Sequence, residues 1–118
     1  MPIRMRGKEE GLRQVSTEIE QDFRKILIAF DQAVVSGTPV DTGRARANWF
    51  MDFGAVRART TGTLTAPDTS RAGRWNLADG NIYFHNSVEY IIYLDQGSSA
   101  QASQGILDPA NAAIRGLL

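Results

Sequence analysis

The strongest constraint on this chain is an apolar repeat that runs from Lys8 to Ser36. Hydrophobic side chains recur there at spacings of three and four residues, which is the period of one face of an α-helix. The stripe consists of Leu12, Val15, Ile19, Phe23, Ile26, Leu27, Phe30, Ala33 and Val34. Gly37 and Pro39 follow directly, and a glycine followed by a proline commonly ends a helix. The pattern therefore predicts a long N-terminal helix.

The length of this helix restricts how the chain can fold. About 29 residues at a rise of 1.5 Å extend for ~43 Å, whereas a compact domain of 118 residues has a diameter of about 35 Å. A straight helix therefore reaches beyond its own globule. Ile28 and Val35 form a second, smaller apolar strip off the main stripe. We expect this strip to contact a neighbouring subunit; the alternative is a kinked or frayed helix with two exposed aliphatic side chains.

Two short segments have the alternating pattern of half-buried strands. The first runs from Ala47 to Phe53 and the second from Asn81 to Asn86. The side chains expected to face inward are Trp49, Met51 and Phe53 in the first strand, and Ile82 and Phe84 in the second. The two segments together predict a small antiparallel sheet.

The C-terminal third predicts further helical structure. Residues from Val88 to Leu94 form a short apolar segment of one or two helical turns, and a loop follows. Asp108 as N-cap and Pro109 at the first helical position then open a short final helix. The expected fold class is α+β, with the long helix packed on a small sheet and the whole of 1–118 forming one domain.

A long polar segment separates the two predicted strands. It runs from Gly54 to Gly80, is rich in Thr, Gly, Ala and Arg, and exceeds the usual length of a loop in a compact domain. We expect a flexible loop, or a hairpin arm that extends the first strand through residues 56–65. Its arginines are the candidates for contact with a partner or with a DNA channel: Arg57, Arg59, Arg71 and Arg74. The alternative is that they pair with carboxylates of neighbouring subunits.

Composition and motifs argue against an enzyme. The chain has no cysteine, which excludes thiolate chemistry. Its 13 basic and 13 acidic residues balance, so the molecule as a whole has no net charge that would attract nucleic acid or a membrane, although the arginines gather between Arg44 and Arg74. No apolar run is long enough to span a membrane, and the N-terminus lacks the apolar core of a secretory signal. Phosphate-binding glycine loops and the Gly-x-Ser-x-Gly elbow are missing. His85 with Glu89 is a weak metal motif, so we expect no catalytic residue, metal or cofactor.

The segment that follows the long helix reads as a structural hinge. Pro39 fixes the turn from helix to strand, and the Asp41 carboxylate can accept hydrogen bonds from backbone N–H groups of the turn. Gly43 supplies the freedom to adopt a positive φ. We therefore interpret Pro39, Asp41 and Gly43 as a turn and not as a catalytic site.

The motif around this hinge resembles a family of phage tail-component proteins. Thr38-Pro39-Val40-Asp41-Thr42-Gly43-Arg44 is followed within a few residues by Asn48-Trp49, as in that family directly after its long helix. A second landmark is the run Asn86 to Ser98, with a Tyr-rich segment before an acidic residue and Gly97. A final helix opened by Pro109-Ala110 also matches. The resemblance covers nearly the whole chain in the right order.

The resemblance implies a structural protein of the virion. Such subunits form a ring, commonly six-fold, at the head–tail junction, where the ring joins the tail to the head connector and lets DNA pass. The implied partners are further copies of the chain, the head connector or stopper, and tail terminator or tube proteins, with weak non-specific DNA contact and no membrane. The implied location is the virion tail or neck, assembled in the host cytoplasm. A tail terminator, a minor tail protein and a small nucleic-acid-binding module with an Arg-rich loop remain alternatives.

Overall fold

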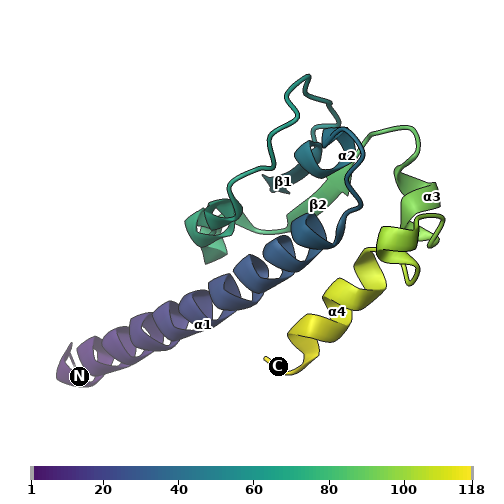
Figure 1. Cartoon of the computed structure of the whole chain (residues 1–118). Coiled ribbons are helices and arrows are strands. Elements are labelled where there is room, and N and C mark those ends of the chain that lie inside the picture. Colours follow the sequence, from purple (N-terminus) through teal and green to yellow (C-terminus); the bar gives the residue numbers. More distant parts are fainter. Residues whose placement is uncertain (1, 118) are drawn as a thin grey trace.

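The protein has an α+β fold built around one long helix (Figure 1). The computed structural model describes the backbone of residues 2–117 and the side chains of residues 11–117. The α-helices are α1 (Pro2–Gly37), α2 (Arg44–Ala47), α3 (Ile91–Asp95) and α4 (Leu107–Arg115), and the strands are β1 (Trp49–Phe53) and β2 (Ile82–Asn86). Three 3-10 helices complete the order: η1 (Thr69–Arg74), η2 (Leu77–Asp79) and η3 (Ala100–Ala102).

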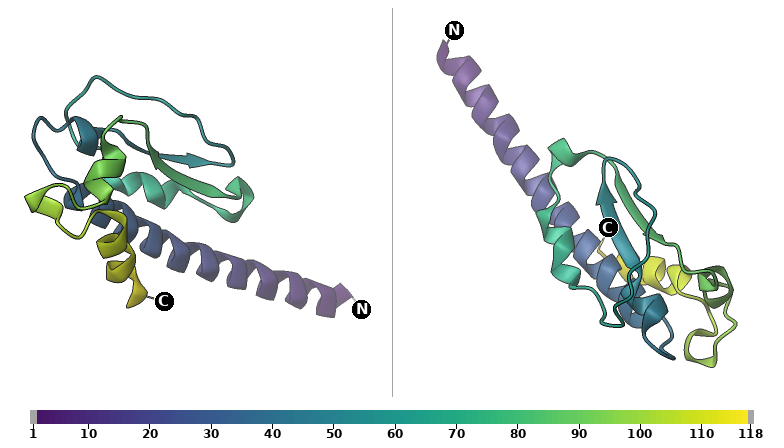
Figure 2. Two further views of the ribbon diagram at one scale, coloured as in Figure 1. Left: turned by 90° about the vertical axis from the view of Figure 1, so that its right-hand side faces the viewer. Right: turned by 90° about the horizontal axis from the view of Figure 1, so that it is seen from above.

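Helix α1 confirms the predicted long N-terminal helix and ends at Gly37, as expected. Its N-terminal part projects away from the other elements, which gather around its C-terminal part (Figures 1 and 2). The radius of gyration is 17.8 Å and the extents are 63 × 29 × 19 Å, whereas a compact chain of this length has a radius of about 13–14 Å. None of the helices in the described part of the chain combines the length and apolar character needed to cross a bilayer.

The sheet consists of β1 and β2, paired antiparallel with Phe50 opposite His85. The predicted alternation is confirmed, because Trp49, Met51 and Phe53 pack against the core together with Ile82 and Phe84. One detail differs from the sequence-based expectation, because the short helix α2 precedes β1. Residues 56–65 form no strand, so of the two alternatives for this segment the structure has the loop and not the hairpin arm. The loop there is held by side-chain bonds instead of strand pairing.

Two clusters of buried side chains form the core. One joins α1, β1 and α4 through Val34, Val35, Trp49, Ile106 and Ala110. In the other, Leu27 of α1 packs with Ala72 and Trp75, which lie in and just after η1.

The prediction for Ile28 and Val35 is wrong as a surface assignment. Val35 is only 5% exposed and belongs to the first cluster, while Ile28 packs against the second. These side chains face the protomer's own sheet and η1, because the elements after α1 fold back over that side of the helix.

A buried ion pair connects α1 with the segment before β2. Asp31 is fully buried, and its two carboxylate oxygens accept bonds from Arg71 Nε at 2.9 Å and Nη2 at 2.8 Å. The Arg71 Nη1 group donates to the Trp49 carbonyl oxygen at 2.7 Å, and the guanidinium lies 5.6 Å from the Phe84 ring centroid. One arginine therefore joins α1, η1, β1 and β2.

The N-terminus of α4 is capped by Asp95, which lies more than ten residues earlier in the sequence, and not by Asp108. The Oδ1 atom of Asp95 accepts bonds from the backbone N–H groups of Ile106 at 3.0 Å and Leu107 at 2.8 Å. The N-cap residue is Ile106, which makes no side-chain cap. The predicted Asp108 cap is thus wrong. The loop turns sharply at Gly105 (φ +84°) and passes close to Asp95, so the Asp95 carboxylate accepts from the N–H groups at the start of the helix.

We expect Asp31→Asn to lower the free energy of unfolding by about 3–5 kcal/mol, since it leaves the Arg71 charge buried without its counter-ion. Urea unfolding monitored by tryptophan fluorescence measures this difference. Glu89→Gln is the matched control, because Glu89 pairs with Arg44 on an exposed surface and its loss should leave the unfolding midpoint nearly unchanged. Equal, small effects of both substitutions would contradict the role given to Asp31.

Candidate subunit interface

The hinge after α1 is closed by a chain of buried hydrogen bonds. The indole Nε1 of Trp49 donates to the Thr38 hydroxyl oxygen at 2.8 Å, and that hydroxyl donates to the Val34 carbonyl oxygen at 2.7 Å. The Arg46 guanidinium donates to the carbonyl oxygens of Ser36 and Thr38 at 3.0 and 2.9 Å. These bonds satisfy groups at the C-terminus of α1 and fix the direction in which the chain enters β1.

Gly43 has the positive φ that the sequence predicts. Its φ is +94°, and a Cβ atom there would lie 2.6 Å from the Leu64 carbonyl oxygen. The turn itself is closed by the Thr42 hydroxyl oxygen, which accepts from the Arg44 N–H at 3.3 Å. The capping role predicted for Asp41 is thus taken by Thr42, its neighbour.

The asparagine of the family-like motif anchors the long loop. Asn48 is fully buried; its Oδ1 accepts from the Thr61 N–H at 2.7 Å, and its Nδ2 donates to the Arg44 carbonyl oxygen at 2.8 Å. The Nδ2 of Asn86 in β2 donates to the Ala45 carbonyl oxygen at 2.8 Å. The motif residues therefore hold the hinge, the loop and the sheet together.

The four loop arginines fall into two groups. Arg59 binds the Asp52 carboxylate through Nη1 at 2.9 Å and Nη2 at 3.0 Å and lies over the Phe50 ring at 4.1 Å. Arg71 is the partner of buried Asp31, so it does not belong to an outward-facing arm. The backbone N–H of Arg57 also bonds to Asp52, at 2.9 Å.

Of the four arginines in the predicted basic arm, only two are therefore exposed to solvent. Arg57 and Arg74 are exposed, whereas Arg59 and Arg71 are partly buried. The sequence does not reveal this division, because Asp31 and Asp52 lie 40 and 7 positions from the arginines that they bind.

His85 belongs to the Asp52 cluster on the outer face of the sheet. Its Nε2 lies 2.7 Å from Asp52 Oδ2, and the hydrogen bond from Arg59 holds the pKa of Asp52 well below its ordinary value. Glu89 lies elsewhere, paired with Arg44 at 2.8 Å. Among the described residues, no group of three or more His, Cys, Asp or Glu side chains is placed to hold a metal ion. The cluster joins the loop to the sheet.

The projecting part of α1 carries the most exposed apolar surface of the long helix. Leu12 is 65% exposed, Val15 and Ile19 are each 51% exposed, and Phe23 is 38% exposed. The sequence places all four in the stripe that packs on the core. The body of the protein first contacts this stripe at Phe23, whose ring centroid lies 4.9 Å from that of Trp75, and buries it at Leu27. The reason is that the chain after the hinge folds back over the C-terminal part of the helix.

An apolar groove continues from this stripe beneath the sheet. It has a volume of about 560 Å³. Its lining comes from α1 (Ile19, Phe23, Leu27 and Phe30), from the sheet (Met51, Ile82 and Phe84) and from the segment between them (Trp75, Leu77, Gly80 and Asn81). No residue of α4 lines it.

Comparisons with protein-family models, with curated proteins and with solved structures found no significant match.

We expect Gly43→Val to destabilise the protein by at least about 1–3 kcal/mol, the cost of forcing a β-branched residue into a positive φ, with the clash against Leu64 added. Asp41→Asn should be mild, because Thr42 closes the turn. Thermal unfolding followed by circular dichroism compares the two variants. An unchanged melting temperature for Gly43→Val would contradict the strained turn.

Proposed function

We propose that this protein is a structural subunit of a phage virion that forms a ring at the head–tail junction. In this role it joins the tail to the head connector, leaves a passage for DNA and performs no catalysis. Two features support the proposal. One is the resemblance of the Thr38–Trp49 segment to phage tail-component proteins, and the other is the exposed apolar stripe on the projecting part of α1.

The exposed stripe is the observation that carries the proposal. Soluble monomers rarely leave a contiguous apolar patch open, and such patches commonly mark interfaces between proteins. The stripe lies on an element that extends beyond the body (Figure 2), where the protomer offers nothing to cover it. A neighbouring subunit of a ring supplies that cover through a head-to-tail contact that closes on itself.

The body of the protomer is suited to hold α1 rigidly in one direction. The hinge, the long loop and the sheet are joined by buried side-chain hydrogen bonds, so α1 projects in a fixed direction. A fixed projection is what a closed ring requires, since the angle between successive copies decides whether the ring closes. The head connector or stopper and the tail terminator or tube are the proposed neighbours above and below the ring.

The Arg-rich loop supports DNA contact only weakly. Arg59 and Arg71 bind carboxylates within the protomer, which leaves Arg57 and Arg74 for a phosphate backbone. Affinity for DNA depends on the number of phosphates that a protein neutralises. A nucleic-acid-binding module is therefore the less favoured function, and any DNA contact in the ring is weak and non-specific.

We expect the double substitution Leu12→Glu with Ile19→Glu to abolish assembly without unfolding the protomer. Both side chains are largely exposed, so their replacement costs the monomer little, whereas two carboxylates in an apolar contact oppose association. Light scattering of the purified protein, and the competence of tails in particles built with it, measure the effect.

Gln21→Glu is the matched control, since Gln21 is exposed on the projecting part of α1 but lies on the opposite face of the helix. Assembly should survive this change. Normal tails and normal association of the Leu12→Glu, Ile19→Glu variant would show that the stripe is not a subunit contact.

A further inference from the structure

The outer edge of β2 carries backbone groups without partners. The Gly54 N–H donates to the Asn81 carbonyl oxygen at 2.7 Å, directly beyond the paired residues of the two strands. Hydrogen-bonded and non-bonded pairs alternate along an antiparallel ladder, so Tyr83 and His85 bond to β1 and the residues that alternate with them point the other way. These outward residues are Ile82, Phe84 and Asn86. In the part of the chain that the structure describes, no hydrogen bond joins their backbone groups to another segment.

The two edges of the sheet differ in this respect. At the edge of β1, the Arg71 Nη1 group donates to the Trp49 carbonyl oxygen at 2.7 Å. Proteins commonly protect an exposed edge strand with a charged side chain, a proline or a bulge. Strand β2 has none of these, because its sequence is Ile-Tyr-Phe-His-Asn and its five residues pair with β1 without a bulge. The edge of β2 is therefore an unprotected template for a further strand.

A second groove leaves room for a strand along the C-terminal half of this edge. It has a volume of about 390 Å³, and Phe84, His85 and Asn86 line it. Because the side chains of successive strand residues point to opposite faces of a sheet, the groove follows the edge and not one face. The chain continues from β2 into α3, which stands at the C-terminal end of the edge (Figure 2). The far wall consists of Ile91 and Ile92 of α3 and Leu107 of α4.

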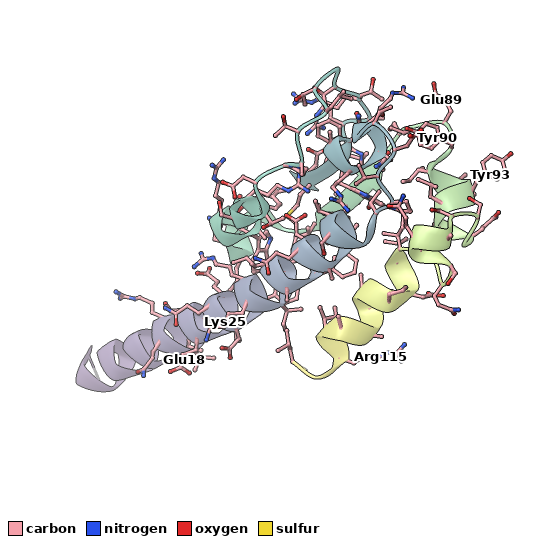
Figure 3. All side chains as sticks on the ribbon, viewed as in Figure 1. Glu18, Lys25, Glu89, Tyr90, Tyr93 and Arg115 are labelled. Carbon is pink, nitrogen blue, oxygen red and sulfur yellow. The ribbon has the colours of Figure 1, made fainter. Side chains whose placement is uncertain are left out.

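The surface beside this groove is apolar and uncovered. Ile92 and Tyr93 are each 64% exposed, and Figure 3 shows Tyr93 directed away from the body. Asp95 is the one acidic residue that lines the groove, and its carboxylate already accepts from the N–H groups of Ile106 and Leu107. The edge and its groove therefore suit an uncharged strand.

Strand β2 of a second copy meets these requirements. When two such strands run antiparallel and are centred on Phe84, Ile82 of one copy lies opposite Asn86 of the other, and the outward groups of both strands form hydrogen-bonded pairs. On the outer face, Tyr83 of one copy then lies opposite His85 of the other. Because β2 contains no Asp, Glu, Lys or Arg, this pairing opposes no like charges. One contact therefore satisfies the free edges of both copies.

We propose that two copies pair through the outer edges of β2 and form one continuous four-stranded antiparallel sheet. The contact is isologous, since each copy contributes the same surface, and two-fold contacts of this kind are the commonest in homo-oligomers. It goes beyond the proposed ring, whose contact is head-to-tail and uses the stripe on α1. The dimer and the ring are therefore separate claims with separate tests.

Disulfide trapping tests this pairing, because the chain has no cysteine. We expect the full-length Tyr83→Cys and His85→Cys proteins, mixed and oxidised, to give a cross-linked dimer on non-reducing gels, since the two positions lie directly opposite each other. Neither variant should cross-link alone, because like positions lie diagonally, about 7–8 Å apart. Val56→Cys mixed with His85→Cys is the matched control and should give no dimer, since Val56 is 51% exposed but lies in the long loop and not on β2.

Two further variants separate the dimer from the ring. Ile82→Pro removes an outward N–H at the first residue of β2, where a sheet edge tolerates proline. We expect it to raise the dissociation constant of the dimer by at least about tenfold in analytical ultracentrifugation, while the circular dichroism spectrum stays that of the folded protein. The Leu12→Glu, Ile19→Glu protein should lose the ring and keep the dimer, because the stripe is not part of this contact.

Three outcomes would overturn the proposed pairing. A protein that stays monomeric at every concentration, with no cross-link in the mixed sample, would contradict it and leave the ring proposal intact. Cross-linking of Tyr83→Cys with itself as readily as with His85→Cys would contradict the antiparallel register. Loss of the dimer in the Leu12→Glu, Ile19→Glu protein would assign the two-fold contact to the stripe instead of β2.

Discussion

The buried pair between Asp31 and Arg71 holds the body of this protein on α1. One carboxylate on the helix fixes an arginine that also binds the Trp49 carbonyl oxygen, and so aligns η1 and β1 with the C-terminal part of the helix. A buried charge without its partner is costly, so this contact determines where on α1 the other elements can settle. Leu12, Val15 and Ile19, on the N-terminal side of this contact, are left largely exposed.

That placement explains the shape of the molecule. The hydrophobic stripe of α1 is continuous along the helix, but the elements after the hinge are too few to cover all of it. The covered part forms the core with Trp49 and Trp75, and the uncovered part projects. The long helix therefore carries more apolar surface than the rest of the protomer can cover. This excess is a physical reason for assembly. The proposed ring uses the projecting part as its contact.

Much of the fold could be predicted from the sequence, because local patterns determine it. The period of α1, the glycine at its end, the alternation in β1 and β2 and the positive φ of Gly43 are all properties of neighbouring residues. Pairings between distant residues could not be predicted. Arg71 reads as part of a flexible arm until Asp31 is seen beside it, and Asp95 caps α4 in place of Asp108 because of a loop return that no local pattern shows.

The candidate interface illustrates the same limit of local patterns. The stripe is evident in the sequence, yet which half of it is buried depends on how the later elements fold back on α1. For this reason Val35 looks like a surface residue and is buried, while Leu12 looks like a core residue and is exposed.

The most direct measurement is amide hydrogen exchange across α1 in the free protein and in the assembled particle. The account predicts that amides of residues 12–23 exchange much faster than those of residues 27–35 in the free protein, and slow by at least about tenfold on assembly. Equal exchange of residues 12–23 in the two states would contradict the claim that another subunit covers the projecting helix.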